Sequence, residues 1–393
     1  MTLWLLSPRD PLIFRDGKPF TAAPGSRAKT LAFPYPSTLV GAVRTQAGTD
    51  AVTGHFDKNR VQEVLQIGMR GPLLVGLSEQ GQIADWFFPA PADALLFKAS
   101  DKCQAMRYPL APIQMPAAAQ TDLKDWNLVG LSKIVKEKPY NKPPRFWYQE
   151  QFEDWLVAPK EDVIELDKLG IHGPSQESRT HVSIAANTQT ALSGALFQTS
   201  GLEFMHMKHK EGEPFSLGKI SKLGIVFETE AGLKSGLSFL GGERRVAHWE
   251  KINSSMPACP SQVKQKILTQ GYCRLFLLTP AFFATGFEPE WIKAHYDVKI
   301  KAAIVNRYQT ISGWDYAYQN GSQHGRPKPT RRLVPAGSVY FLKLADDVEK
   351  RKSFLNDIWM NNISDDEQSR RDGLGLAALG TWDDQLHDME MQS

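Results

Sequence analysis

The first 48 residues, MTLWLLSPRDPLIFRDGKPFTAAPGSRAKTLAFPYPSTLVGAVRTQAG (residues 1–48), predict a strand, a long loop and a helix in that order. Met1–Leu6 is a short apolar run rich in Leu and Trp, which is typical of a buried strand. Residues 7–36 contain repeated prolines and glycines, which neither a helix nor a central strand tolerates. Ser37 is a favourable N-cap for a helix from Thr38 to Ala47.

The rest of the chain mixes predicted strands and helices without the regular alternation of a doubly wound sheet, which favours an α+β fold with antiparallel sheets. A length of 393 residues exceeds what one hydrophobic core usually holds, so we expect two domains. The predicted strands are Leu73–Leu77, Trp86–Phe88, Gly224–Glu228, Tyr272–Thr279 and Ser338–Leu344, and the predicted helices are residues 58–67, 188–197, 260–269 and 346–360.

Charge and cysteine content narrow the class of protein. The net charge of +3 and the pI near 8.5 are too mild to identify a nucleic-acid binder, so any basic surface must be local. Cys103, Cys259 and Cys273 form no CxxC pair, which argues against a zinc site or a disulfide framework. The chain shows neither a signal peptide nor an apolar run of membrane-spanning length. We therefore expect a cytoplasmic protein without metal or cofactor.

The long N-terminal loop contains Arg15, Lys18, Arg27 and Lys29, with Asp16 as the only acid among them. Glycines in this loop allow the backbone to approach a ligand closely. A basic loop that leads into the start of a helix can bind phosphate through backbone N–H groups and the positive end of the helix dipole. The alternative is a solvated loop with ordinary surface cations.

The segment KIVKEKPYNKPPRFWY (residues 133–148) interleaves cations with aromatic residues. Cations neutralise phosphates and aromatic rings stack on bases, so this mixture suits single-stranded nucleic acid. For Phe146 and Trp147, anchoring of the segment on the core is the favoured interpretation. For the lysines, an RNA-binding or partner-binding surface is favoured instead.

Two basic runs lie beside glycines. Gly241–Arg245 (GGERR) follows an apolar stretch, and Gly321–Arg332 (GSQHGRPKPTRR) has four Lys and Arg residues and no acid. The prolines of the second run predict an irregular, exposed loop. Arginines close together repel one another unless an anion lies between them, so both runs favour contact with phosphate.

The histidines offer weaker indications of chemistry. His206 and His209 are three residues apart, but no Asp, Glu or Cys pattern completes a metal site. His172 and His181 flank Arg179, and a histidine base beside a cation could cleave RNA. A histidine that forms a hydrogen bond or contacts phosphate is the favoured interpretation. The sequence contains no GxSxG, HExxH, Walker A or DFG-type motif.

Several motifs together resemble the RAMP (repeat-associated mysterious protein) superfamily and, within it, the third Cmr-module subunit of type III-B CRISPR complexes. The most specific are the segments PLIFRDGKPF (residues 11–20) and FPYPSTLVGAVRT (residues 33–45). The similarity continues in order along the chain and is weakest in residues 100–160, which look inserted. The further matching segments are GPLL (71–74), FLGGER (239–244), TPA (279–281), GWD (313–315), RRLVPAGSVYF (331–341), GLG (373–375) and LGTW (379–382).

The resemblance implies two ferredoxin-like (RRM-like) domains with long inserted loops, which we place at residues 1–265 and 266–393. It implies binding to the repeat-derived 5′ tag of the CRISPR RNA and docking onto the large polymerase-like subunit, next to backbone and stem RAMP subunits. Neither the residues nor the resemblance assigns a catalytic site. The positions carried over as RNA-proximal are Arg15, Lys18, Ser37, Thr38, Arg44, Arg244, Arg331, Gly373 and Gly375, while Arg27, Lys29, Arg245 and Lys328 rest on charge and context.

Arg44 needs its own argument because it lies inside the predicted helix. It is about two turns after Ser37, on a side that does not carry Leu39, Val43 and Ala47. We therefore expect it to face a ligand. Two alternative functions remain open: a RAMP endoribonuclease that processes precursor CRISPR RNA without metal, and a purely structural adaptor that clamps the large subunit.

Overall fold

The computed structural model describes residues 1–15, 27–28, 30–115, 121–123, 125–207, 220–320 and 323–388. The chain forms two compact units, each assembled from three separate segments. Within the described ranges, no helix is both long and apolar enough to cross a membrane. The predicted division at residue 265 stays a prediction. Unit 1 contains residues 1–84, 173–254 and 310–331, and unit 2 contains residues 85–172, 255–309 and 332–393.

Unit 1 is built around an antiparallel sheet in which β1 (Thr2–Pro8) is a central strand. Leu5 of β1 lies opposite Val226 on one neighbouring strand and Glu250 on the other. Leu3–Leu6 are all buried, and successive side chains of a strand point to opposite faces, so both faces of the sheet are covered here. The strand order is β3 (Met69–Leu77), β15 (Ile220–Thr229), β1, β17 (Val246–Ile252) and β16 (Gly236–Phe239).

Helix α1 (Pro36–Gly48) lies beside this sheet, and it begins before the predicted N-cap. The residue at the N-cap is Tyr35, without a side-chain cap, so the expectation that Ser37 caps the helix was wrong. Pro36 explains the earlier start, because its fixed φ suits the first helical position and its missing N–H costs nothing there. The predicted helix at 58–67 is present as η1 (Lys58–Arg60) followed by α2 (Val61–Leu65).

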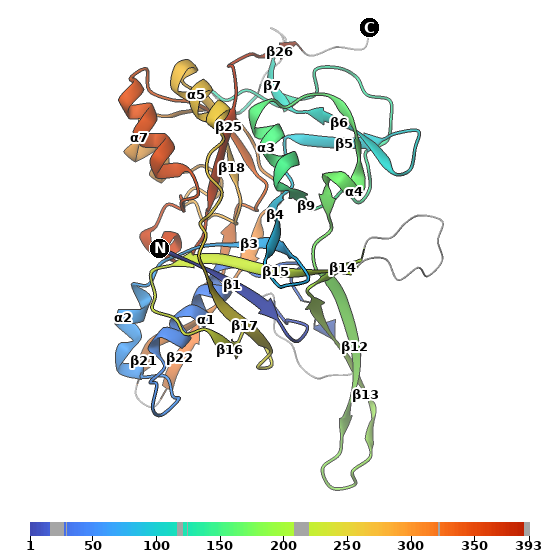
Figure 1. Ribbon diagram of the computed structural model, residues 1–393, viewed down its shortest axis with the longest axis vertical. Helices are drawn as coiled ribbons and strands as arrows, with labels where there is room; N and C mark the ends of the chain where they lie inside the picture. Colours follow the sequence, from blue (N-terminus) through green and yellow to red (C-terminus); the bar gives the residue numbers. More distant parts are fainter. Residues whose placement is uncertain are drawn as a thin grey trace. The chain divides into compact units, whose positions relative to one another are not determined.

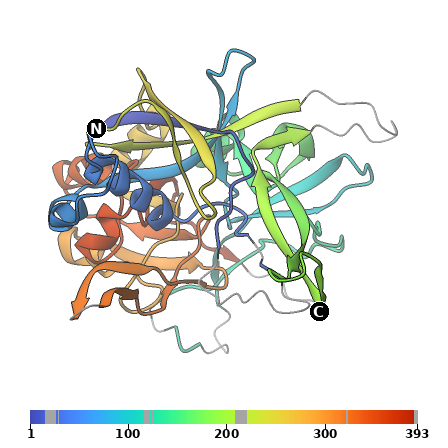
Figure 2. The ribbon, with the colours of Figure 1, turned by 90° about the horizontal axis from the view of Figure 1, so that it is seen from below.

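A long hairpin of β12 (Ser175–Ile184) and β13 (Ala191–Glu203) extends from unit 1 (Figures 1 and 2). The helix predicted at residues 188–197 was therefore wrong. Its alanines and leucines favour a helix locally, but pairing with β12 along most of β13 overrides that propensity. The same strand pairs in parallel with β2 (Arg27–Ala28) at Gln198 and Thr199.

Unit 2 is built around a second antiparallel sheet, and helices α3, α5 and α7 pack against its strand β25. The strand and helix predictions at 272–279, 338–344, 260–269 and 346–360 are confirmed in this unit. The strand order is β19 (Lys299–Ile304), β24 (Val339–Lys343), β18 (Tyr272–Leu277) and β25 (Ala377–Thr381), and the helices are α3 (Gln149–Val157), α5 (Ser261–Gln270) and α7 (Val348–Ile358).

The described part of residues 100–160 contributes to the core of unit 2. Phe146 and Trp147 are buried, so the interpretation that they anchor this segment is confirmed. Trp155 of α3 is buried as well, and its indole packs edge-to-face on Trp147 at a ring-centroid distance of 5.9 Å. The guanidinium of Arg107 lies over both indole rings.

A buried ionic cluster also stabilises unit 2. Arg274 and Asp93 are only 2% and 1% exposed, and Arg274 Nη1 donates to Asp93 Oδ2 at 2.5 Å. Trp155 Nε1 donates to the other carboxylate oxygen at 2.8 Å, and Arg274 Nε donates to the Thr381 carbonyl at 2.8 Å. Each charge therefore has partners on several sides, which burial of an ion pair requires.

Shorter elements complete the two units. Strand β4 begins in unit 1 and continues in unit 2, and β20 and β23 also span boundaries between segments. The remaining elements are β4 (Ile83–Pro89), β5 (Ala94–Lys98), β6 (Gln104–Pro109), β7 (Ala111–Gln114), β8 (Val129–Gly130), β9 (Phe146–Tyr148), β10 (Asp162–Glu165), α4 (Leu166–Leu169), β11 (Gly170–Ile171), β14 (Met205–Met207), α6 (Glu290–His295), β20 (Gln309–Ile311), β21 (Trp314–Asn320), β22 (Gln323–Pro327), β23 (Arg331–Leu333), α8 (Glu367–Arg371) and β26 (His387–Asp388).

Candidate nucleic-acid interface

The turn between β16 and β17 lies against the N-terminal segment of the chain. The Gly242 N–H donates to the Ile13 carbonyl at 2.8 Å. Gly241 has a φ of 80°, and a Cβ at this position would lie 2.6 Å from the same carbonyl oxygen. Only glycine permits this approach, so the two glycines of the GGERR run bring its charged residues beside the segment that leads to Arg15.

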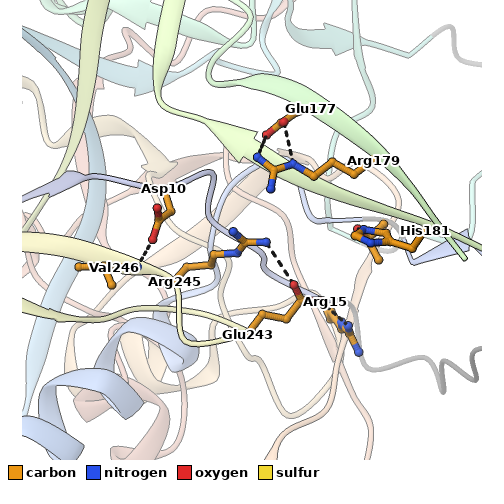
Figure 3. A network of polar contacts seen from close by, with 9 residues as sticks. Asp10, Arg15, Glu177, Arg179, His181, Glu243, Arg245 and Val246 are labelled. Atoms are coloured by element: carbon orange, nitrogen blue, oxygen red, sulfur yellow. Dashed lines mark hydrogen bonds and ion pairs between the residues drawn. The ribbon is translucent and has the colours of Figure 1, made fainter. Parts of the chain in front are cut away.

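Glu243 connects two arginines that are distant in sequence (Figure 3). Its Oε1 lies 3.3 Å from Arg15 Nη2, and its Oε2 lies 3.2 Å from Arg245 Nη2. The Arg15 and Glu243 side chains are 43% and 40% exposed. Ion pairs this exposed contribute little to stability, so the arrangement orders charged side chains at the surface more than it stabilises the fold.

Arg244 occupies an unfavourable backbone conformation. Its φ is 51° and that of Glu243 is 57°, a region that residues other than glycine rarely adopt. Each such residue costs on the order of 1–3 kcal/mol and is found most often at functional sites. The Arg244 side chain is exposed, lies 5.8 Å over the Phe239 ring, and forms no ion pair within the described part of the chain. The turn therefore holds a guanidinium available to an anion.

The β12–β13 hairpin places a second polar group near this turn (Figure 3). Arg179 pairs with Glu177 at 2.8 Å, and His181 Nε2 lies 2.9 Å from Thr199 Oγ1. The His181 ring also stacks on Phe197. Burial and then the charges of Glu177 and Asp10 raise the pKa of Glu203. The hydrogen-bonded, stacked His181 fits the favoured interpretation of this histidine, whereas His172 belongs to unit 2.

Arg44 does not face solvent as expected. Its side chain is buried, with the residue 8% exposed, and Nη2 donates to the Ile67 carbonyl at 2.9 Å. The buried side of α1 includes Val40 beside Leu39 and Val43, so it is wider than the predicted apolar stripe and extends to Arg44. The expectation of an exposed Arg44 was wrong, because its guanidinium binds the carbonyl group that follows α2. Contact with RNA at this position stays a prediction.

The other basic positions lie on separate elements of unit 1. Lys328 is exposed, and its N–H donates to the Gly313 carbonyl at 2.8 Å. Arg331 lies on β23 and is half-buried. The run that contains them was expected to be an irregular loop, but residues 323–327 form β22, which pairs with β21. The strand can pair because its proline is its last residue, where a missing N–H does not interrupt the strand.

Ser37 and Thr38 lie in the first turn of α1 and are half-buried. Arg27 belongs to β2, where its backbone pairs with Gln198. Lys18 and Lys29 lie outside the described residues. The assignment of all these positions to RNA binding stays a prediction.

Gly373 and Gly375 belong to unit 2, and both are buried. Each has a φ of 86°. Thr279 Oγ1 donates to the Gly373 carbonyl at 2.8 Å and accepts from the Gly375 N–H at 3.0 Å. A Cβ at Gly375 would lie 2.9 Å from the Ser364 backbone nitrogen. Here glycine is needed for the packing of the loop itself.

A comparison with protein-family models assigns the chain to a family. The model of the CRISPR-associated protein (Cas_Cmr3) matches residues 4–382. The chain belongs to the Cas_Cmr3 family. The resemblance stated from the sequence motifs is therefore confirmed, and the chain is a subunit of a type III-B CRISPR effector.

Two solved structures are similar to the chain. One is the cryo-EM structure of the Type III-B Cmr-beta bound to cognate target RNA and AMPPnP, state 1, with 14% sequence identity, 86% of each chain covered and a TM-score of 0.45. The other is the cryo-EM structure of the Type III-B Cmr-beta bound to cognate target RNA, with 15% identity, the same coverage and a TM-score of 0.46. No curated protein matched the chain.

Sequence reasoning missed the role of Glu243 in this Cas_Cmr3 chain. Its carboxylate joins Arg15 and Arg245 from segments more than two hundred residues apart, with a separation of 228 between Arg15 and Glu243. The acid inside the GGERR run was the available signal, because a carboxylate between arginines is a natural shared partner. The sequence pattern indicates Arg179 only as an aid to cleavage, whereas the structure pairs it with Glu177 on the β12–β13 hairpin.

Proposed function

We propose that this Cas_Cmr3 subunit binds the 5′ repeat-derived tag of the CRISPR RNA and docks onto the large polymerase-like subunit, without catalysing a reaction. The observation that carries the proposal is the turn at Glu243–Arg244, where a strained backbone presents an exposed arginine beside the shared Arg15 and Arg245 cluster. Single-stranded RNA exposes both its phosphates and its bases to loops of this kind.

The strand orders support a finer proposal about the fold. In unit 1, four strands that occur in the chain as β1, β3, β15 and β17 lie side by side in the sheet in the order β3-β15-β1-β17. In unit 2 the strands β18, β19, β24 and β25 lie in the order β19-β24-β18-β25. Both sheets are antiparallel and share one pattern, with the first and third strands central. We infer that each unit is a ferredoxin-like domain.

Binding of tagged RNA to the full chain tests the main proposal. Replacing Arg15 and Arg244 by alanine should weaken binding of a tag-bearing guide by about 1–3 kcal/mol and reduce its salt dependence by roughly one to two counterions. Removing two exposed lysines of α5, Lys264 and Lys266, is the charge-matched control. Equal affinity of the wild-type chain for tagged and scrambled RNA, or an unchanged affinity of the Arg15 and Arg244 variant, would overturn the proposal.

Two further measurements separate the alternative functions. Co-expression with the large subunit should raise the soluble yield and the Tm of the chain, because a partner that binds the folded state stabilises it. Repeat-containing RNA should remain intact with the purified chain, with and without Mg²⁺. Cleavage that disappears in a His181→Ala variant would instead establish an endoribonuclease.

A further inference from the structure

A group of cationic side chains in unit 2 lies outside the interface described above. Strand β9 pairs with β11, with Phe146 opposite Ile171. The Arg145 N–H donates to the Ile171 carbonyl at 3.0 Å, and the Arg145 carbonyl accepts from the Ala90 N–H at 2.8 Å. His172 directly follows Ile171. Arg145 and His172 therefore flank the same end of this strand pair, and each is partly covered while part of its surface remains exposed.

Lys142 supplies a third cation to this group. Pro143 and Pro144 connect it to Arg145, and their fixed φ angles limit the positions that the lysine can take. Burial and then the charges of Arg145 and Lys142 lower the pKa of His172. The imidazole thus experiences the positive potential of both neighbours.

The two sequence stretches that carry these cations lack carboxylates. The sequence has no acid between Glu137 and Glu150, and none between Asp167 and Glu177. Among the described residues, Lys142, Arg145 and His172 form no ion pair. Burial alone lowers the pKa of Arg145, whose guanidinium lies 5.9 Å over the Phe146 ring. Cations held together without an acid repel one another, and an anion between them would remove that repulsion.

We infer that Lys142, Arg145 and His172 bind a phosphate group of single-stranded RNA. A guanidinium, an ammonium and an imidazole provide several N–H donors for phosphate oxygens. Tyr140 is half-buried, and its N–H donates to the Leu96 carbonyl at 2.8 Å, so an aromatic ring on which a base can stack has a fixed backbone nearby. The inference rests on the proposed binding of guide RNA and adds a contact on unit 2.

A triple variant of the full chain, Lys142→Ala with Arg145→Ala and His172→Ala, tests the inference. Fluorescence anisotropy at several salt concentrations would use a tag-bearing guide and a length-matched RNA with a scrambled tag. Phosphate contacts carry no sequence information. We therefore expect the triple variant to bind both RNAs roughly tenfold more weakly, with a similar factor for each. The slope of log affinity against log salt concentration should become shallower by about one to two.

The controls make failure of this site distinguishable from failure of the tag-binding proposal. The paired Lys264→Ala and Lys266→Ala substitutions should leave both affinities unchanged. If the triple variant has a lower Tm, two single variants replace it. Lys142→Ala should reduce the salt slope of binding by about one, whereas Arg145→Lys keeps the charge and should leave the slope unchanged. Unchanged binding of both RNAs by the triple variant overturns the inference, even where the wild-type chain prefers the tag. Normal RNA binding with lost co-purification of the large subunit overturns it as well, in favour of a protein contact.

Discussion

The two units use the pairing of arginine with carboxylate in opposite ways. In unit 2, Arg274 and Asp93 are buried, and backbone carbonyl groups and the Trp155 indole complete their hydrogen bonds. In unit 1, Glu243 lies at the surface between Arg15 and Arg245, on a turn with a strained backbone. The buried cluster stabilises the fold, whereas the exposed one keeps its arginines at the surface, where they can exchange Glu243 for an anionic partner.

The burial of an arginine–carboxylate pair therefore indicates whether the pair serves the fold or a ligand, which the presence of the two residues alone does not. A buried charge without a partner costs several kcal/mol, so its partners must be complete. An exposed charge is solvated and can exchange water for a ligand at little cost. The following substitutions test this contrast, with one tightly packed glycine of unit 2 as an intermediate case, in order of decreasing effect.

Asp93→Ala should cause the largest loss of stability. It leaves Arg274 buried without its carboxylate, and we expect the free energy of unfolding to fall by about 3–5 kcal/mol. Denaturant unfolding measures the loss. Replacing both members with apolar residues, as Asp93→Leu with Arg274→Met, should cost less because no charge remains buried. A single variant as stable as wild type would show that the cluster contributes nothing to the fold.

Gly375→Ala should have an intermediate effect. The added methyl group would approach the Ser364 backbone, and the left-handed φ is unfavourable for alanine, so we expect about 2–3 kcal/mol of destabilisation. Gly81→Ala is the matched control, since Gly81 has a φ of 79° and nothing within 4 Å of an added Cβ. It should cost about 1 kcal/mol. Equal Tm losses for the two variants would argue against close packing at Gly375.

Glu243→Gln should have the smallest effect on stability, below about 1 kcal/mol, because the ion pairs that it removes are exposed. It should nevertheless strengthen RNA binding. Arg15 and Arg245 would lose the carboxylate that they share, and the salt dependence should become steeper by roughly one counterion. Thermal unfolding and RNA titration on the same preparation separate the two quantities. Weaker RNA binding would mean that Glu243 positions the arginines for the ligand.

Much of the fold could be predicted because its apolar runs have clear periods. The strands around Leu5, Val75, Val226 and Leu275, together with the helix that begins at Pro36 and the one that follows Pro260, follow from the local apolar pattern. The hairpin at residues 175–203 could not be predicted, because its second strand has helix-favouring residues and only pairing determines its conformation. The local pattern also does not indicate that the chain alternates between two units.

The candidate interface was predictable in composition and less so in geometry. The GGERR run indicates a glycine turn with charges, and the structure adds the contact with Ile13 and the shared carboxylate. Arg44 shows the limit of the helical pattern, since its exposure depends on the carbonyl group of Ile67 in the segment that follows α2. Positions of this kind depend on tertiary contacts between segments, which spacing within one helix does not encode.

The alternation of the chain between its units has a consequence for biosynthesis. Unit 1 cannot be completed until residue 331 has been synthesised, and unit 2 needs β25, which ends at Thr381 and pairs with β18. Synthesis must therefore reach residue 331 before unit 1 has all its segments, and Thr381 before the sheet of unit 2 is complete. Until then, unpaired strand edges remain open to other chains. A nascent subunit of this architecture depends on rapid completion, or on protection by chaperones, to reach its partner complex intact.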